Sequence, residues 1–268
     1  MDNRPIAVFD SGVGSLSVIR LLRKEIPGES IVYLADRARY PYGKKTKEQL
    51  KSIIIQTLKY LERFGPKIII VASITPSIQV LRECKVYTNI PVFGVYLNIE
   101  EAVSLSKSKF IALLATEGIT QSTALDDYVK PFIMTTRIIN VNASPIIDVV
   151  ESGKFLEDYG LVKETISNNT AAISSNPKID VIILGSTHLS MIKEHISSVY
   201  QKVQLVDPAV NTVRHVKTYL RHQDVAAQNN GIMRILVSKN TRQFETIVRA
   251  LGIQERVEEV NLDLKINY

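Results

Sequence analysis

Short apolar runs alternate with longer amphipathic segments along the whole chain. The apolar runs are rich in β-branched residues and are apolar almost throughout, which is typical of strands buried on both faces of a parallel sheet. The segments between them have the periodicity of helices that cover such a sheet. The pattern therefore predicts an α/β protein with mainly parallel sheets, whose strands are IAVFD, SIVYLA, KIIIVA, PVFGVY, FIALLA, RIINVN, DVIILG, VQLVD, MRILVS and VEEVNL.

Capping residues indicate where several helices begin and end. Thr46 and Gln49 have the spacing of a capping box before a long amphipathic segment, and Gly65-Pro66 is a typical helix stop after it. Proline fits the first position of a helix, after a polar capping residue, because its missing N–H needs no partner there. This pattern predicts helix starts directly after strands at Thr75-Pro76, Ser144-Pro145 and Asp207-Pro208.

Similar segments in the two halves of the chain suggest an internal repeat. IAVFDSG resembles IALLATEG, and IIIVASITPS resembles VIILGSTHLS, at nearly equal separations. The similarity favours two pseudo-symmetric α/β lobes, although unrelated α/β strand ends also look alike. We expect residues 1–97 with 208–268 to form the first lobe and residues 98–207 the second, with a ligand cleft between them.

Composition and the single cysteine narrow the class of protein. Of the 268 residues, 45% are hydrophobic and 22% are charged, as in globular proteins. The chain enters a strand-like run at once and has no run long enough to cross a bilayer, so we expect a cytoplasmic protein with no signal peptide and no membrane span. Cys84 is the only cysteine, which excludes an internal disulfide, a multi-cysteine metal site and a pair of catalytic thiols.

The net charge of +6 does not by itself predict nucleic-acid binding. Lysines and arginines are interspersed with acidic residues, as in EQLKSIIIQTLKYLER, and no long basic block or aromatic-basic stripe occurs. We therefore interpret the basic residues as parts of solvated faces and expect no nucleic-acid partner.

Polar residues directly after predicted strands are the candidates for chemistry, because ligands of open α/β sheets bind at the carboxyl ends of the strands. Asp10 and Ser11 begin a glycine-containing turn before a helix, whose first amides suit a carboxylate or phosphate. A purely structural turn remains the alternative, since aspartate and glycine favour turns. The turn is not a dinucleotide fingerprint, because Ser17 stands where the third glycine would be.

Other candidates lie in loops or near the ends of strands and helices: the Tyr42-Gly43 loop, Ser73 with Thr75, the Ser186-Thr187-His188 segment, and Glu151. The tyrosine loop offers hydroxyls and a backbone turn to a small polar ligand. Ser186 and His188 suggest a nucleophile and its base, but the sequence around them is not a G-x-S-x-G elbow, and neighbouring residues seldom have the needed geometry. The histidines have no carboxylate-histidine motif, so we expect no metal site.

Taken in order, these segments resemble the glutamate racemases of the aspartate/glutamate racemase superfamily. VFDSGVGSLSV is similar to their opening motif, DRARYPYGKK to their tyrosine loop, and ATEG-x-x-x-S to their second-lobe turn. DVIILGSTHLSMI is similar to their second cysteine strand and VQLVDPA to their return segment. The resemblance reaches ERVEEVNL and so spans almost the whole chain.

The resemblance implies inversion of glutamate at Cα by two cysteines that act on opposite faces, with no pyridoxal phosphate, other cofactor or metal. It also implies a cytoplasmic isomerase that makes D-glutamate, a peptidoglycan precursor, and a homodimer. The substrate-binding positions carried over are Asp10, Ser11, Tyr42, Gly43, Thr75, Thr116 and Thr187, and the catalytic positions are Ser73, Ser186, Asp10, His188 and Glu151.

The departures from the family pattern fall at the catalytic positions. Ser73 and Ser186 stand where the family has cysteines, and Ile74 and Ile119 replace an asparagine and a threonine that contact substrate. A serine hydroxyl is roughly five pKa units less acidic than a thiol, which adds about 7 kcal/mol to forming the base and slows that step by about five orders of magnitude. Asp10 or His188 acting through a serine would supply a base without restoring the matched pair.

We therefore expect a racemase-family protein whose activity is weak, altered or lost. One alternative is a non-catalytic protein that binds a small amino acid or another small carboxylate. Another is a different reaction that uses serine or histidine.

Overall fold

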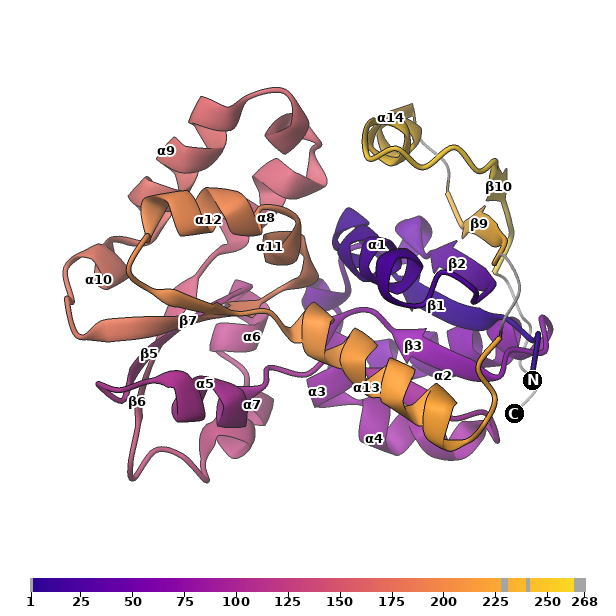
Figure 1. Ribbon diagram of the computed structural model, residues 1–268, viewed down its shortest axis with the longest axis horizontal. Coiled ribbons are helices and arrows are strands. Elements are labelled where there is room, and N and C mark those ends of the chain that lie inside the picture. The colour runs from indigo at the N-terminus through magenta and orange to yellow at the C-terminus, as the bar shows by residue number, and fades with distance from the viewer. Residues whose placement is uncertain (1, 228–230, 240–241, 263–268) are drawn as a thin grey trace. The chain divides into compact units, whose positions relative to one another are not determined.

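The computed structural model describes residues 2–227, 231–239 and 242–262, which fold into two compact units (Figure 1). Unit 1 comprises Met1–Val95 and Ala209–Tyr268, and unit 2 comprises Tyr96–Pro208. Each unit contains one sheet, and all strand pairs observed in the described residues are parallel. The predicted α/β class with mainly parallel sheets is confirmed, and an observed strand lies in each predicted run. Within the described ranges, no helix is long and apolar enough to cross a membrane.

The sheet of unit 1 has the order β10-β9-β2-β1-β3-β4. All residues of its three inner strands β1, β2 and β3 are buried, as their uninterrupted apolar sequences predict. The C-terminal part of the chain returns to this sheet, because β9 pairs with β2. The strands are β1 (Ile6–Asp10), β2 (Ile31–Ala35), β3 (Ile68–Val71), β4 (Val92–Gly94), β9 (Met233–Val237) and β10 (Val257–Glu259).

Helices cover this sheet on both sides, with α1 and α14 drawn above it and α2, α3 and α4 below it in Figure 1. The α-helices are α1 (Leu16–Glu25), α2 (Lys47–Glu62), α3 (Ile74–Gln79), α4 (Leu81–Cys84), α13 (Pro208–His222) and α14 (Arg242–Ala250). The 3-10 turns are η1 (Val13–Ser15), η2 (Arg37–Arg39), η3 (Tyr42–Lys44) and η4 (Lys85–Tyr87).

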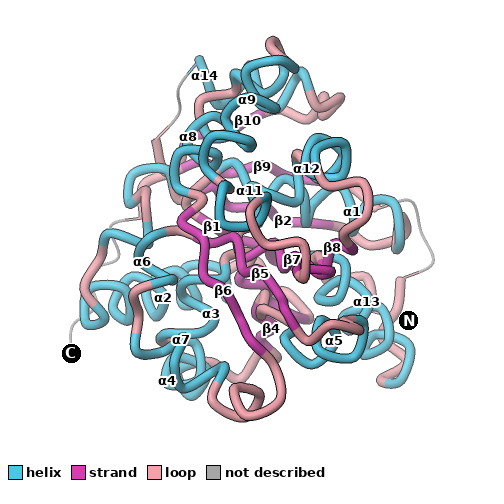
Figure 2. Tube along the Cα trace, turned by 90° about the vertical axis from the view of Figure 1, so that its left-hand side faces the viewer, coloured by secondary structure: helices cyan, strands magenta, loops and turns pink. Residues whose placement is uncertain are grey.

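The sheet of unit 2 has the order β6-β5-β7-β8, and its strands lie side by side in Figure 2. They are β5 (Phe110–Ala115), β6 (Arg137–Asn142), β7 (Ile179–Gly185) and β8 (Gln204–Val206). The helices and turns of this unit are α5 (Ile99–Leu105), α6 (Glu117–Thr120), α7 (Thr123–Val129), α8 (Ser144–Glu151), η5 (Lys154–Leu156), α9 (Tyr159–Asn169), α10 (Ala171–Ser174), α11 (Thr187–Met191) and α12 (Lys193–Val199).

The predicted helix starts are partly right. The capping box is confirmed, because the Thr46 side chain accepts from Gln49 N and the Gln49 side chain accepts from Thr46 N. Pro208 is the first residue of α13, as predicted. The structure corrects the other two starts, since α3 begins at Ile74 and α8 at Ser144, which places their prolines one or two positions further into the first turn. Proline is tolerated there because none of the first four N–H groups has a partner within the helix.

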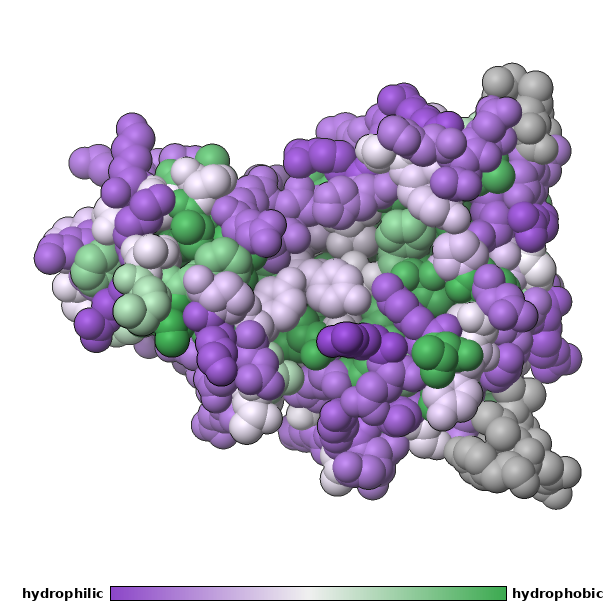
Figure 3. All heavy atoms as spheres, turned by 90° about the horizontal axis from the view of Figure 1, so that it is seen from below, coloured by the Kyte–Doolittle hydropathy of each residue, from purple (hydrophilic) through white to green (hydrophobic). Residues whose placement is uncertain are grey.

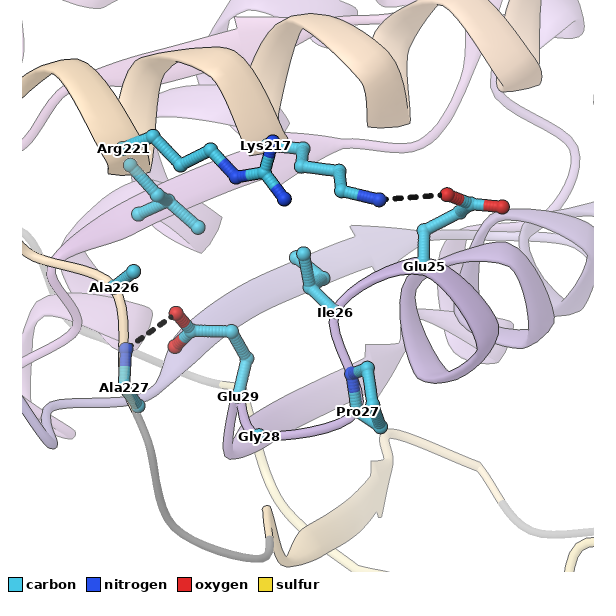
Figure 4. A pocket seen from close by; sticks show the side chains of 10 residues that line it. Glu25, Ile26, Pro27, Gly28, Glu29, Lys217, Arg221, Ala226 and Ala227 are labelled. Carbon is cyan, nitrogen blue, oxygen red and sulfur yellow. Dashed lines mark hydrogen bonds and ion pairs between the residues drawn. The ribbon is translucent and has the colours of Figure 1, made fainter.

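One buried ion pair joins distant segments of unit 1. Lys67 Nζ lies 2.6 Å from Glu29 Oε2, and both side chains are almost fully buried. The ammonium group also donates to the carbonyl oxygens of Asp2 and Val225, each at 2.7 Å, while Ala227 N donates to Glu29 Oε1 (Figure 4). Both charges are therefore compensated, as burial requires.

The surface is mainly polar on the side drawn in Figure 3. Hydrophobic residues appear there in smaller, separated groups, as is usual for the surface of a folded chain.

Candidate functional site

In unit 1, polar residues stand at or just after the ends of three neighbouring strands. Asp10 ends β1 opposite Ala35 of β2, and Asp36 N donates to Asp10 O at 2.7 Å. Ala72 N donates to Phe9 O, so the β3 end that leads to Ser73 lies beside the end of β1. The structure therefore brings the predicted residues Asp10, Ser11 and Ser73 to one edge of the sheet, where ligands of such sheets bind.

The Tyr42 hydroxyl is already used by the protein. Tyr42 Oη donates to Asp36 Oδ2 at 2.9 Å, and the ring is buried. Burial, and next the negative charge of Asp36, hold the pKa of Tyr42 well above its ordinary value, so this hydroxyl stays protonated at neutral pH. The hydrogen of this hydroxyl is therefore committed to a buried carboxylate of unit 1.

The loop nevertheless lies beside another predicted site residue. A Cβ atom on Gly43 would lie 4.0 Å from Thr75 Oγ1. Ser73, the residue before α3, is extended and makes no side-chain capping bond, while Ser77 Oγ donates to its carbonyl oxygen at 2.6 Å. The Gly43 backbone and the Thr75 hydroxyl are thus neighbours next to the Ser73 position.

In unit 2, site residues follow the adjacent strands β5 and β7. Thr116 comes directly after β5, and its Oγ1 is buried with no hydrogen-bond partner among the described residues. Ser186 comes directly after β7 and accepts from His188 N at 3.4 Å, and Thr187 begins α11 as a buried residue. Strands β5 and β7 pair with each other up to Ala115 and Gly185, so the residues that follow them share one edge of the sheet.

A hydrogen-bonded chain of three side chains lies at this edge. Ser186 Oγ is 3.3 Å from His188 Nδ1, and His188 Nε2 is 2.8 Å from Glu151 Oε2. All three residues are buried. The sequence-based objection that Ser186 and His188 are too close in the chain for such geometry is therefore wrong, because the turn into α11 places both side chains on one side. Glu151, the last residue of α8, is not a surface charge.

His195 does not belong to this group. His188 lies on α11 and His195 on α12, two short helices that are interrupted at Ile192. Within the described residues, no group of three or more histidine, cysteine, aspartate or glutamate side chains is arranged to hold a metal ion.

The remaining thiol lies elsewhere. Cys84 ends α4, is fully buried and donates to Lys51 O of α2 at 3.8 Å. Burial raises its pKa from 9.0 to about 11, so thiolate is scarce at neutral pH. Cys84 is therefore no substitute for a catalytic thiol.

A pocket of about 190 Å³ in unit 1 lies at the opposite edge of the sheet. It is lined by the end of α1, the segment before β2 and the last turns of α13, and Lys217 Nζ pairs with Glu25 Oε2 across it at 2.9 Å (Figure 4). Because Glu29 lies just before β2 begins, the pocket is at the amino end of that strand and is separate from the predicted site residues.

The sequence analysis did not identify two residues that hydrogen-bond around Tyr42 in unit 1, Asp36 and Ser238. Asp36 is fully buried and also accepts from Arg39 Nη1 at 3.3 Å and from Ser238 Oγ at 3.0 Å. Asp36 directly follows an apolar run, as Asp10 does, so that signal was present. No sequence signal pointed to Ser238, because only the pairing of β9 with β2 brings it near Asp36.

The chain is similar to known proteins over most of its length. The family model described as Asp/Glu/Hydantoin racemase matches residues 14–216. The glutamate racemase of Limosilactobacillus reuteri is 32% identical over 230 residues, 85% of each chain. The crystal structure of glutamate racemase isoform RacE1 from Bacillus anthracis superposes with a TM-score of 0.87 at 28% identity, covering 99% of this chain and 100% of that one.

A further solved structure contains a ligand. It is the glutamate racemase from Francisella tularensis in complex with D-glutamate, with a TM-score of 0.83 at 27% identity, covering 98% of this chain and 99% of that one. Together with the family match and the shared fold, these similarities show that the chain belongs to the glutamate racemase family.

Proposed function

We propose that this chain binds glutamate, or a related small amino dicarboxylate, and exchanges its Cα proton through Ser186 alone, so that inversion is slow or lost. The observation that carries the proposal is the Ser186–His188–Glu151 chain, which has no counterpart at Ser73 among the described residues. The family and the relative solved with D-glutamate support the choice of ligand.

Buried polar groups at the strand ends suit an amino acid. Asp10 is a buried carboxylate, which suits an ammonium group, and Thr75 and Thr187 are buried hydroxyl residues two positions and one position after the two serines. Thr116 Oγ1 has no partner within the described residues, which costs about 1–3 kcal/mol for a buried polar group. A ligand carboxylate that accepts from this hydroxyl would recover part of that cost.

Proton transfer on the Ser186 side requires no group beyond those present. The carboxylate of Glu151 accepts from His188 Nε2–H, which leaves Nδ1 of the neutral ring to accept the Ser186 hydroxyl proton. The Ser186 oxygen then removes the Cα proton, and the electron pair of the C–H bond passes to the ligand carboxylate group. Return of a solvent-derived proton from the same serine restores the original enantiomer.

Inversion needs a second acid on the other face of Cα. Ser73 supplies a hydroxyl, but no described residue forms a hydrogen bond with its side chain, and it lacks a histidine-carboxylate pair. An unassisted serine would return the proton slowly, because its acidity is far below that of a thiol. The two serines therefore differ in function, and exchange with retention should exceed inversion.

Proton NMR in D2O tests this directly. Purified protein is incubated with L-glutamate and with D-glutamate separately, and with the two aspartates in parallel, while the Cα–H signal and the chirality are followed. We expect one enantiomer to lose its Cα–H signal at least tenfold faster than its mirror image appears. Ser186→Ala should abolish the exchange, whereas Ser73→Ala should leave it.

Two results would overturn this mechanism. Equal rates of exchange and inversion, both abolished by Ser73→Ala, would show a two-sided racemase that uses serines. No loss of the Cα–H signal over days would show that the protein does not catalyse proton exchange. If millimolar glutamate or aspartate also failed to raise the melting temperature, the protein would not bind these ligands either.

A further inference from the structure

We propose that Asp36 is the positioning residue of the unit 1 site: it holds Tyr42, and through Tyr42 the backbone of Gly43, against Thr75. As far as it concerns ligand binding, this inference rests on the proposed function.

Asp36 is a fully buried carboxylate at the end of a central strand. Its Oδ2 accepts from Tyr42 Oη at 2.9 Å and from Arg39 Nη1 at 3.3 Å, and its Oδ1 accepts from Ser238 Oγ at 3.0 Å. Arg39 compensates the charge and in turn donates to Gln56 Oε1 of α2 at 2.9 Å. A buried charge that is paired and fully hydrogen-bonded has a fixed position.

Tyr42 transmits this position to the loop. Its ring is buried, and its hydroxyl has Asp36 as its hydrogen-bond acceptor, so both ends of the side chain are held. The residue begins η3, and the next residue is Gly43. A Cβ atom on Gly43 would lie 4.0 Å from Thr75 Oγ1. A shift of the Tyr42 ring would therefore move the loop relative to Thr75.

The C-terminal segment completes the arrangement. Ser238 follows β9, donates from Oγ to Asp36, and accepts from Ala38 N at 2.9 Å. The end of β2 and the tyrosine loop that follows it thus meet the distant return strand at one carboxylate. Asp36 is fully buried and bonded to Tyr42, so it acts through the loop instead of on a ligand.

Three variants separate this role from general stability. Asp36→Ala removes the acceptor, Asp36→Asn keeps one carbonyl oxygen for Tyr42, and Asp180→Asn is a matched control in unit 2. Asp180 is also a structural carboxylate, which accepts from Ser106 Oγ at 2.6 Å and from the backbone N–H groups of Lys107 and Ser108, each at 2.8 Å.

The first measurement is 13C NMR of protein labelled at tyrosine Cζ. The Tyr42 signal is assigned by its loss in Tyr42→Phe. We expect Asp36→Ala to shift and broaden this signal, Asp36→Asn to do so less, and Asp180→Asn to leave it unchanged. The Tyr42 signal is measured without ligand, so it tests the role of Asp36 even if the protein proves not to bind glutamate.

The second measurement is glutamate affinity by calorimetry. Asp36→Ala should weaken binding roughly tenfold through a misplaced loop, Asp36→Asn less, and Asp180→Asn not at all, although all three lower the melting temperature. Where Asp36→Ala does not fold, Tyr42→Phe removes the same hydrogen bond and should weaken binding to a similar extent. An unmoved Tyr42 signal in folded Asp36→Ala, or equal weakening in Asp180→Asn, would overturn the inference.

Discussion

His188 Nε2 lies 2.8 Å from Glu151 Oε2, although 37 positions separate the two residues in the chain. A carboxylate accepts hydrogen bonds, so in the neutral ring the proton belongs on Nε2 and Nδ1 faces Ser186 Oγ as an acceptor. In this orientation Nδ1 can accept from the Ser186 hydroxyl, and the bond to Glu151 fixes the ring.

The tautomer of His188 is therefore predicted to depend on Glu151. The chain has 4 histidines, so 15N NMR resolves their rings, and His188→Gln assigns the relevant signal. We expect the Nε2–H tautomer to dominate at neutral pH, and Glu151→Gln to give a mixture and slow any Cα–H exchange about tenfold or more. Glu157→Gln, at an exposed position nearby, is the control and should change neither. An unchanged tautomer in Glu151→Gln would contradict the orienting role.

Restoring thiols at both serine positions should restore inversion. A thiol forms its conjugate base far more readily than a hydroxyl, so we expect Ser73→Cys with Ser186→Cys to racemise glutamate at least a hundredfold faster than the unsubstituted chain. Either single change should raise inversion much less, because both faces of Cα need an acid. Chiral chromatography of the product measures this. A double variant that racemises no faster than the unsubstituted chain would show that the missing thiols alone do not limit inversion. Ile74→Asn with Ile119→Thr, added to the double variant, would then test the two isoleucines.

The native thiol should be almost inert. Burial raises the pKa of Cys84 from 9.0 to about 11, so at pH 8 its thiolate fraction is about a hundredfold lower than in the unfolded chain. We expect an Ellman-type disulfide reagent to label Cys84 more than a hundredfold faster in denaturant than in buffer. Because the folded pKa is raised, the native rate should increase with pH up to about 11. Rapid labelling at pH 8 without denaturant would show that the α2–α4 packing opens readily.

The Lys67–Glu29 pair should contribute strongly to the stability of unit 1. Lys67→Met leaves the buried Glu29 carboxylate without its cation, and removing one partner of a buried pair costs about 3 kcal/mol or more. Lys59→Met is the matched control, because Lys59 pairs with Glu62 at 3.1 Å on the surface, where such pairs contribute about 0–1 kcal/mol. Urea unfolding followed by circular dichroism gives both values. Equal decreases in the free energy of unfolding in the two variants would contradict the prediction that burial makes the Lys67–Glu29 pair the stronger contributor.

The Ser186–His188–Glu151 chain shows how far local patterns reach. Ser186 and His188 were found because they follow an apolar strand directly, and Glu151 because it lies near the end of a predicted helix. Their contacts were not predictable, because they depend on how the end of α8 packs beside the turn into α11. The tyrosine loop was also recognised from its sequence, but the bond of the Tyr42 hydroxyl to Asp36 was not predicted.

By itself the sequence determined the α/β class, the strands and the parallel arrangement, since these follow from periodicity and from burial of uninterrupted apolar runs, which are local properties. It also determined which residues stand at the strand ends. Only the tertiary structure decided which of them are neighbours. The Ser186–His188–Glu151 chain, the Asp36–Ser238 bond and the Lys67–Glu29 pair each join segments that are brought together by strand order and helix packing. Such contacts depend on positions in space that no local pattern encodes.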